Sequence, residues 1–557
     1  MVRVLTPVWV DGIQRLKIAP EAPAPLARGL EPPLLRQNSA IRYDRCLAQL
    51  RSKTSPIEQY IFLQQLKGHD VHMFYRIILD NMSEVTPLIY TPTVGDACLQ
   101  FSHNYRVPEG IFVSWSDRGN IGKVLRNWPK MSDARIAVVT DGSRILGLGG
   151  ELGRRDGRVS RSGVNGYPIS SGKLSLYVAG AGVRPESTVP ICLDLGTNNE
   201  KFLNDPLYLG MRRKRISDVE MDGFMDEFMR EMKAVFPKLL VQFEDFSTDH
   251  AFAYLDRYRH KYPVFNDDIQ GTGAVVLSGF MNAAKLSSNA SGRPLSDHRI
   301  LFLGSGSAGV GVGMQLMSFF TLVAGLSQEE ARNRIYYIDS QGLITADRPN
   351  LAEHKKFFAR TDCPHLTDLV DIIDYVKPTA LLGLSTTKGA FDRDVVEAMA
   401  ALNERPIIFP LSNPVRLCEL DFPDAIEWTD GKVIFASGSP YAPVTYNGRT
   451  YYAGQGNNMY IFPGLGLGAI LAGASSVTDS MVETSSTSLA AALTPEEHAA
   501  GLIYPRIERI REISARLATD VIIESRKRNV AHNPAVLALR DDEIVPWVKE
   551  RMFTPVV

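Results

Sequence analysis

The stretch RILFLGSGSAGVGVGMQLM, residues 299–317, decides the fold. It opens with a short apolar run that predicts a buried strand. Three glycines with GxGxxG spacing follow this run: Gly304, Gly306 and Gly309. In this spacing the glycines allow a tight turn, a close backbone approach to a pyrophosphate and close packing of helix on strand. The apolar segment that comes next predicts a helix whose N-terminus would point at phosphate. We interpret the stretch as a dinucleotide-binding turn, with a glycine-rich packing loop as the alternative.

Strand and helix patterns alternate from this stretch onward. Apolar runs typical of buried strands recur at residues 299–304, 334–339, 379–384, 406–412 and 433–438. Helical patterns separate these runs, which is typical of a parallel sheet with crossover helices. Asp339 ends the second run, at the position where an acidic side chain can hold a ribose hydroxyl. The sequence therefore predicts an α/β protein with a Rossmann-type dinucleotide-binding domain.

A second glycine-rich stretch, RILGLGGELGRRDGRVSRSGVNG at residues 144–166, competes for the phosphate-binding role. Its later glycines would break any helix, whereas a dinucleotide-binding turn must lead into one. We therefore interpret it as a surface loop. Just before it, the apolar runs on either side of Asp141 and Gly142 predict a β-hairpin with a tight Asp-Gly turn.

Composition excludes several classes of protein. The chain has 557 residues, 45% of them hydrophobic, so a large core and about two to four domains are expected. A net charge of −1 argues against a nucleic-acid partner. The five cysteines are far apart and form no CxxC pair, which fits a reducing compartment without structural zinc. The apolar run at residues 460–474 contains Pro463 and is too short to span a bilayer. We expect no membrane segment and a cytoplasmic location, with the mitochondrion as the alternative.

Four carboxylates follow two apolar runs. Glu244 and Asp245 come after the run KLLVQF, and Asp267 and Asp268 come after VFN. Like charges at two neighbouring strand ends repel one another unless a cation lies between them. Hard cations such as Mg2+ and Mn2+ prefer oxygen ligands. The pattern indicates a metal site, against the alternative that these acids face solvent.

Several polar residues are candidates for catalysis or substrate binding. Lys173 is predicted near a helix start, where the helix dipole and burial would lower its pKa and suit it to act as a general base. Tyr90 stands between two Thr-Pro corners that would present its phenol rigidly. Asn413, Asn457 and Asn458 occupy glycine- or proline-containing turns. They are either turn formers or ligands of a substrate carboxylate. For Lys173 and Tyr90 the alternatives are a surface lysine and an ordinary half-buried tyrosine.

The remaining patterns complete the predicted architecture. Residues 39–82 are predicted to be helical, with a Ser-Pro start at Ser55. A Met/Phe stripe in residues 221–236 indicates a core-facing helix, and TPEE at residues 494–497 is a capping box. We predict a mostly helical N-terminal region, a second parallel α/β domain for substrate and catalysis, the Rossmann domain and a C-terminal tail. Their predicted boundaries are residues 1–108, 109–266 with 459–530, 267–458 and 531–557 respectively.

Ten segments, in chain order, resemble the malic enzyme family: IYTPTVG, SDRGN, RILGLG, GKLSLY, FEDF, FNDDIQGT, LGSGSAG, NERPIIFPLSNP, FASGSP and GQGNNMYIFPG. They cover nearly the whole chain from about residue 40. The resemblance implies oxidative decarboxylation of L-malate to pyruvate and CO2, with NAD(P) and with Mg2+ or Mn2+. It also implies a homodimer or a homotetramer.

The resemblance assigns a role to each matching position. Glu244, Asp245 and Asp268 would ligate the metal. The acid–base roles are as follows: Lys173 takes the proton of the C2 hydroxyl, Asp267 tunes the charge of Lys173, and Tyr90 protonates the enol carbon. The substrate and nicotinamide contacts are as follows: Arg144 clamps a substrate carboxylate, Asn413 and Asn458 complete the pocket, and Asn457 lies near the nicotinamide.

The cofactor preference rests on the residues near Asp339. An acidic residue at this position generally indicates NAD. In the malic enzyme family, however, a serine beside it and a lysine further on mark NADP, and this chain has Ser340 and Lys355 there. Arg348 adds positive charge, and a 2′-phosphate needs a cation. We therefore predict NADP, with NAD as the alternative.

The chain departs from the family pattern after Arg144. Lys173 follows 29 residues later, further along the chain than in the family, and Glu151 stands where an aspartate is usual. The intervening loop carries several arginines. We interpret it as a surface loop, or alternatively as a site for an anionic effector or a neighbouring subunit. Two other functions stay open from the sequence: a malolactic enzyme and a non-catalytic dinucleotide-binding regulator.

Overall fold

The computed structural model describes residues 5–10, 13–18, 39–107, 109–145, 163–413 and 415–556. Their contacts divide the chain into two compact units. One unit consists of the residues up to Ile89 together with those from Thr554 onward, and the other consists of Tyr90–Phe553. Both parallel sheets belong to the second unit. The arginine-rich loop at residues 146–162 lies outside the described residues, so the expectations for that loop stay predictions.

The first unit is mainly helical, as predicted for residues 39–82. Its elements are α1 (Ser39–Arg51), α2 (Pro56–His69), α3 (Val71–Asp80), α4 (Met82–Ile89) and the antiparallel strands β1 (Leu5–Val10) and β2 (Ile13–Ile18). The predicted start of α2 is confirmed. The Ser55 side chain accepts a hydrogen bond from the backbone N–H of Glu58, and the Glu58 carboxylate accepts one from the backbone N–H of Ser55. This reciprocal pair satisfies two backbone donors that the first helical turn leaves unpaired.

The larger sheet of the second unit confirms the Rossmann-type prediction. Its strands, in order across the sheet, are β10 (Gly342–Leu343), β9 (Ile335–Asp339), β8 (Ile300–Leu303), β11 (Ala380–Gly383), β12 (Ile407–Pro410), β13 (Ile434–Ser437) and β16 (Gly454–Gln455). Every neighbouring pair is parallel except β9 and β10. The five strands predicted between residues 299 and 438 all belong to this sheet.

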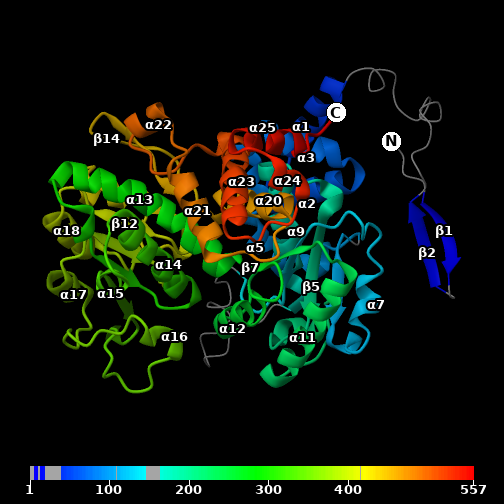
Figure 1. Ribbon diagram of the computed structural model, residues 1–557, viewed down its shortest axis with the longest axis horizontal. Helices are drawn as coiled ribbons and strands as arrows, with labels where there is room; N and C mark the ends of the chain where they lie inside the picture. The colour runs from blue at the N-terminus through cyan, green and yellow to red at the C-terminus, as the bar shows by residue number, and fades with distance from the viewer. Residues whose placement is uncertain are drawn as a thin grey trace. The chain divides into compact units, whose positions relative to one another are not determined.

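Helices surround the larger sheet (Figure 1). They are α13 (Thr272–Ser291), α14 (Ser307–Ser318), α15 (Gln328–Arg332), α16 (Glu353–Lys356), α17 (Leu369–Val376), α18 (Arg393–Leu402) and α19 (Phe422–Trp428). Leu301, Leu381 and Ile408 share a core with side chains of α17, α18 and α19. Helix α13 contacts β12 and β13. Because helices cover a parallel sheet, its strands are apolar along their whole length, which explains their continuous apolar runs.

The smaller sheet confirms the second parallel α/β fold. Its order is β3 (Ile111–Ser114), β5 (Thr188–Asp194), β4 (Ile136–Thr140), β6 (Leu240–Phe243) and β7 (Val264–Asn266), and all pairs are parallel. The helices α7 (Ile121–Leu125), α11 (Asp218–Val235) and α12 (Thr248–Tyr258) share one core with this sheet. The predicted Met/Phe stripe of α11 is buried in that core. Contacts from α9 (Tyr167–Ala181) and α20 (Phe462–Ala472) also reach this sheet.

The predicted hairpin at Asp141-Gly142 is wrong. Strand β4 pairs in parallel with both β5 and β6, so it lies inside the sheet and no returning strand follows at residues 143–145. The Asp141 side chain instead accepts hydrogen bonds from the backbone N–H and hydroxyl of Ser143 and pairs with Arg215. An Asp-Gly pair favours a hairpin only where a free strand edge is available, and β4 has none.

The C-terminal part of the second unit is helical. Its helices are α21 (Asp479–Ala490), α22 (Pro495–Ala499), α23 (Ile510–Lys527), α24 (Pro534–Ala538) and α25 (Asp541–Arg551). The predicted capping box at the start of α22 is confirmed, since Thr494 and Glu497 each accept a hydrogen bond from the other's backbone N–H. No helix among the described residues is long and apolar enough to cross a membrane.

His298 is a buried titratable side chain that should make the stability of the fold depend on pH. Its ring nitrogens lie 3.0 Å from the Ser288 hydroxyl and 2.8 Å from the Thr379 hydroxyl. Burial, with a smaller contribution from Arg293, lowers the pKa of His298 to about 4. The unfolded chain therefore binds a proton at a higher pH than the folded chain does. The contribution of this residue to stability is complete above pH ~6.5 and is lost as the pH falls toward ~4.

We expect the wild type to lose about 2 kcal/mol more of its free energy of unfolding between pH 7 and pH 5 than His298→Gln. The glutamine keeps hydrogen-bonding capacity but does not titrate. Chemical denaturation of both proteins at the two pH values measures the difference. Comparing the pH-dependent losses, rather than the stabilities themselves, removes the cost of the substitution. Equal losses in the two proteins would contradict the expectation.

Candidate active site

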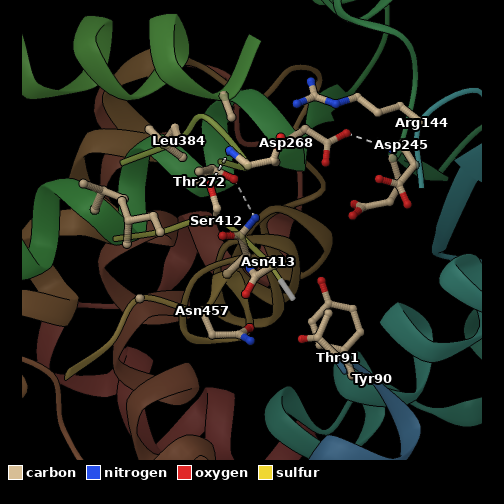
Figure 2. Close-up of a pocket in the computed structure, with 17 residues that line it drawn as sticks. Tyr90, Thr91, Arg144, Asp245, Asp268, Thr272, Leu384, Ser412, Asn413 and Asn457 are labelled. Atoms are coloured by element: carbon tan, nitrogen blue, oxygen red, sulfur yellow. Dashed lines mark hydrogen bonds between the residues drawn. The ribbon is translucent and has the colours of Figure 1, made fainter. Parts of the chain in front are cut away.

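A cavity of about 150 Å³ lies where the carboxyl ends of strands from both sheets meet. Glu244 and Asp245 follow β6, Asp268 follows β7, and Ser412 and Asn413 follow β12. In open α/β sheets, ligands bind at the carboxyl ends of the strands. Figure 2 shows side chains from these separate segments projecting toward one space.

Three carboxylates form one cluster in this cavity. One oxygen each of Glu244, Asp245 and Asp268 lies within 4.8 Å of the other two. The backbone N–H of Asp245 donates to Asp268 Oδ2 at 2.8 Å, and Asp245 has a φ of 57°, in the left-handed region. Strained backbone of this kind is common at functional sites.

The donor set fits a hard divalent cation. Burial raises the pKa of Glu244 well above its usual value, and the Asp268 charge adds to this increase while Lys173 opposes it. Burial likewise raises the pKa of Asp268. Glu244 and Asp245 are buried and Asp268 is half-buried, so these acids do not face open solvent. Three partly dehydrated oxygen donors that repel one another suit Mg2+ or Mn2+.

Lys173 lies behind this cluster, in the second turn of α9, and its side chain is fully buried. Its Nζ lies 2.9 Å from Glu244 Oε1 and forms a shorter ion pair with Asp267. The expected low pKa is therefore wrong. Burial alone would lower the pKa of Lys173, but the charges of Asp267 and Glu244 outweigh that effect and hold the pKa well above its usual value. The lysine lies past the helix start, so its charge is governed by these two carboxylates.

Tyr90 and Asn458 lie next to the buried pair of Lys173 and Asp267. Tyr90 is buried, its ring centre lies 5.1 Å from Lys173 Nζ, and burial raises the pKa of its phenol. Asn458 Nδ2 donates to Asp267 Oδ2 at 3.0 Å and to Thr272 Oγ1 at 2.9 Å. The phenol therefore keeps its proton at neutral pH. Oδ2 of Asp267 accepts hydrogen bonds from both Lys173 and Asn458.

The other predicted substrate-binding residues also line the cavity. The Arg144 backbone N–H donates to the carbonyl of Asp245 at 2.9 Å, and its guanidinium donates to Thr248 Oγ1 at 3.3 Å. Asn413 Oδ1 accepts a hydrogen bond from the Ser439 hydroxyl at 2.6 Å. Asn457 lines the cavity as well. Figure 2 shows Arg144 near Asp245 and Asp268, with Asn413 and Asn457 on two other segments.

Sequence reasoning missed a buried hydrogen-bond chain that orients Glu244. The Tyr177 hydroxyl donates to Gln242 Oε1 at 2.6 Å, and Gln242 Nε2 donates to Glu244 Oε2 at 2.9 Å. Gln242 is the polar residue inside the apolar run KLLVQF. Because buried polar groups need partners, that exception to the pattern was a usable signal.

A second network was not detectable from the sequence. Buried Arg215 pairs with Asp141, which binds Ser143, and the Ser143 hydroxyl accepts from the backbone N–H of Ser247 at 2.7 Å. The chain of contacts joins the segment before Arg144 to the segment after Asp245. Arg215 and Ser247 lie far from Asp141 and Ser143 in the sequence, so no local motif connects them.

The glycine turn has the geometry that its sequence predicts. Gly304 has a φ of 115°, and a Cβ on Gly309 would overlap the Gly304 carbonyl. Gly306, in contrast, has no atom within 4 Å of the position its Cβ would occupy. Protein packing therefore requires glycine at 304 and 309 but not at 306, where the open face leaves room for a ligand's phosphates. Ala308, inside the same turn, lines the cavity with the carboxylates.

The end of β9 carries an excess of positive charge. Lys355 Nζ lies 2.7 Å from Asp339 Oδ2, and Arg348 Nη2 lies 2.9 Å from Asp339 Oδ1. Burial would raise the pKa of Asp339, but Lys355 and Arg348 outweigh it and lower the pKa. Ser340 is exposed beside this group. Two cations thus surround one carboxylate.

Comparison with known proteins identifies the family. A family model described as "Malic enzyme, N-terminal domain" matches residues 67–259, and one described as "Malic enzyme, NAD binding domain" matches residues 269–525. The chain belongs to the malic enzyme family.

Among relatives of this malic enzyme family member, the "NADP-dependent malic enzyme" of Dictyostelium discoideum is 46% identical over 95% of this chain and 93% of its own. "NADP-dependent malic enzyme 2" of Arabidopsis thaliana is 42% identical over 95% and 86%. The crystal structure of Entamoeba histolytica malic enzyme matches the fold with a TM-score of 0.55 and 23% identity, over 84% of this chain and 80% of that one.

Alanine substitutions should separate the packing and binding roles of the glycine turn. We expect Gly306→Ala to leave the thermal unfolding midpoint unchanged but to weaken dinucleotide binding at least tenfold, since the methyl group would meet only the ligand. Gly309→Ala should lower the midpoint, because the methyl group overlaps backbone. Thermal unfolding and fluorescence titration with dinucleotide measure both effects. Unchanged binding in Gly306→Ala would show that no dinucleotide lies against this glycine.

Proposed function

We propose that this protein catalyses the oxidative decarboxylation of L-malate to pyruvate and CO2 with reduction of NADP. The observation that carries the proposal is the shared cavity. It is lined by the carboxylate cluster, by Tyr90, by Arg144 and by Ala308 of the glycine turn. The family membership and the NADP-dependent names of the relatives support the same reaction.

Two bound groups are proposed, a divalent metal ion and NADP. Glu244, Asp245 and Asp268 would hold Mg2+ or Mn2+. NADP would contact the following residues: Gly304, Gly306, Gly309, Asp339, Ser340, Arg348, Lys355 and Asn457. When bound, the cation would favour negative charge at the C2 oxygen of malate and the nicotinamide would supply a hydride acceptor. The positive excess around Asp339 supports NADP over NAD, because a 2′-phosphate gains charge-assisted hydrogen bonds there.

The pair of Lys173 and Asp267 is proposed to take the proton of the C2 hydroxyl. An ammonium cannot accept a proton, so Nζ must first pass one to Asp267 Oδ2, to which it donates a hydrogen bond. Nζ can then take the hydroxyl proton as hydride leaves C2. Asn458 supports this transfer because it donates to the same Asp267 oxygen at 3.0 Å.

Tyr90 is proposed to return a proton to carbon after CO2 leaves. Its raised pKa keeps the phenol protonated, and the 5.1 Å separation of its ring centre from Lys173 Nζ lets the lysine replace the proton that it gives up. The hydroxyl proton of malate thus replaces CO2 on C3. No net proton is taken up, because the hydrogen on C2 leaves as hydride.

Arg144 and Asn413 are proposed to hold the substrate carboxylates, with Asn458 completing the pocket. The Arg144 backbone is hydrogen-bonded to Asp245, so the same contact fixes the guanidinium relative to the metal ligands. A bidentate Arg–carboxylate pair would set the orientation of malate.

The predicted domain boundaries are also proposed for this protein: residues 1–108, 109–266 with 459–530, 267–458 and 531–557. Strands β3 to β7 fall within the second of these regions and strands β8 to β16 fall within the third, which supports the division. The resemblance supports a homodimer or a homotetramer. We propose a cytoplasmic location, supported by five cysteines that are all free thiols.

Substitution of Tyr90 tests the reaction and the proposed proton donor together. With L-malate, Mn2+ and NADP, the wild type should release CO2 and form NADPH. Tyr90→Phe should lower kcat about a hundredfold or more, since it removes a positioned acid, while dinucleotide binding stays unchanged. Absorbance of NADPH and release of CO2 are the two readouts.

Tyr105→Phe provides the matched control, because this tyrosine is partly exposed and does not line the cavity. Full activity of Tyr90→Phe would remove Tyr90 from the mechanism. Wild-type protein inactive with either NADP or NAD would overturn the proposed function. CO2 release without NADPH would identify a malolactic reaction instead.

Substitution of Lys355 tests the cofactor preference. Lys355→Gln should lower kcat/KM for NADP about tenfold or more, because a charge-assisted contact to the 2′-phosphate is lost, and should leave the value for NAD equal or higher. Lys356→Gln is the matched control, since this neighbouring lysine pairs with Glu353 instead. Steady-state kinetics with both cofactors measure the ratio. An unchanged ratio in Lys355→Gln would contradict the assignment.

A further inference from the structure

A second cavity, of about 370 Å³, lies away from the proposed active site. It is bordered by residues before β12, by residues before and at the start of β13, and by Ala500, Gly501 and Ile503. Strand β15 (Arg449–Tyr451), which pairs with β14 (Val444–Tyr446), also borders it. Figure 1 shows β14 and α22 near this edge of the larger sheet. Because the cavity borders the amino ends of these strands, it is at the opposite end of the sheet from the catalytic residues.

Three cations line this cavity: Arg405, Lys432 and Arg449. Within the described part of the chain, none of the three forms an ion pair with a carboxylate. Arg405 is half-buried, and its Nε donates only a long hydrogen bond of 3.4 Å, to the carbonyl of Lys432. Burial and then the charge of Arg449 lower the pKa of Arg405. Arg405 and Arg449 therefore repel each other, and no ion pair among the described residues offsets that repulsion.

The acidic residues at this cavity do not neutralise the cations. Glu404 and Asp430 line it, but both are exposed. The hydroxyl of Tyr446 donates to Asp430 at 3.4 Å. Three cations against two carboxylates leave an excess of one positive charge. Lys432 and Arg449 are exposed like the two acids, so Arg405 is the one half-buried charge among these five.

The backbone fixes the two arginines. The Arg405 carbonyl accepts a hydrogen bond from the Ser287 hydroxyl of α13 at 3.0 Å. Arg449 belongs to a three-residue strand paired in register with β14, and its guanidinium lies 5.2 Å from the ring centre of Tyr451. Arg449 is thus held on a strand and the backbone of Arg405 by a hydrogen bond to α13, so both lose less freedom when they bind a ligand.

We propose that this cavity binds a small polyanion, a phosphorylated or polycarboxylate metabolite, as an effector distinct from the substrate. Its volume is within the range of small-molecule pockets and its shape is concave, unlike most protein–protein contact surfaces. An anion would compensate the charge that Arg405 and Arg449 leave unpaired. It would bind far from the reacting atoms, because α13 separates Thr272 of the first cavity from Ala290 of the second by about 27 Å along the helix.

Calorimetric titration of the full-length protein tests the proposal, with inorganic pyrophosphate and citrate as separate probes. The protein is kept in metal-free buffer of low ionic strength and saturated with NADP, which occupies the glycine turn. We expect wild-type binding of at least one probe. Its Kd should rise about tenfold or more in Arg405→Gln and in Arg449→Gln. Arg393→Gln is the matched control, an exposed arginine on α18 that pairs with Glu397, and its Kd should stay within twofold.

The two probes separate the sources of the ligand. Affinity for pyrophosphate alone would show that the cavity binds phosphorylated metabolites, and affinity for citrate alone that it binds polycarboxylates. Affinity for both would show that it accepts both classes of anion. Arg449→Gln keeps the test decisive if Arg405→Gln does not fold, because Arg449 is exposed. Absence of wild-type binding, or equal binding in wild type and both variants, would overturn the proposal. A change of oligomeric state without a change in binding would overturn it in favour of a contact between copies.

Discussion

The ammonium of Lys173 lies inside the protein between the carboxylates of Glu244 and Asp267. Moving any one of these charges out of water costs several kcal/mol, and only mutual pairing offsets that cost. The three residues lie in α9, directly after β6 and directly after β7. These parts of the chain must therefore pack together in the folded protein, because each buried charge is stable only when its partners lie beside it. The parallel order β4–β6–β7 provides this arrangement.

The pairing also leaves negative charge that a bound cation would balance. Four carboxylates gather here, from residues 244, 245, 267 and 268, whereas Lys173 and Arg144 supply only two positive charges. Lys173 pairs with one oxygen of Asp267 and one oxygen of Glu244, and Gln242 donates to the other Glu244 oxygen. The remaining negative charge is concentrated toward the cavity. A divalent ion would relieve that repulsion, so the same contacts that stabilise the lysine prepare the proposed metal site.

Local rules were sufficient for some of these features and insufficient for others. The turn at Gly304 was predictable because strand, glycine spacing and helix lie within 19 consecutive residues. The acidic pairs were predictable because the carboxyl ends of parallel strands meet. The pKa of Lys173 was not, since its direction depends on partners that lie 71 and 94 residues away. The hairpin prediction failed for a related reason: a local turn signal cannot show that β4 already has a partner on both sides.

Charge also orients the proposed cofactor. The active-site cavity is acidic, whereas the end of β9 holds two cations against one carboxylate. Oxidised NADP has the complementary polarity, with a cationic nicotinamide ring at one end and a 2′-phosphate at the other. These opposite charges would disfavour binding of the dinucleotide in the reverse direction. A divalent ion on Glu244, Asp245 and Asp268 would cancel much of the negative charge of the cavity. The two cations around Asp339 would therefore contribute most to the orientation in the metal-loaded protein, because their charge does not depend on the metal site.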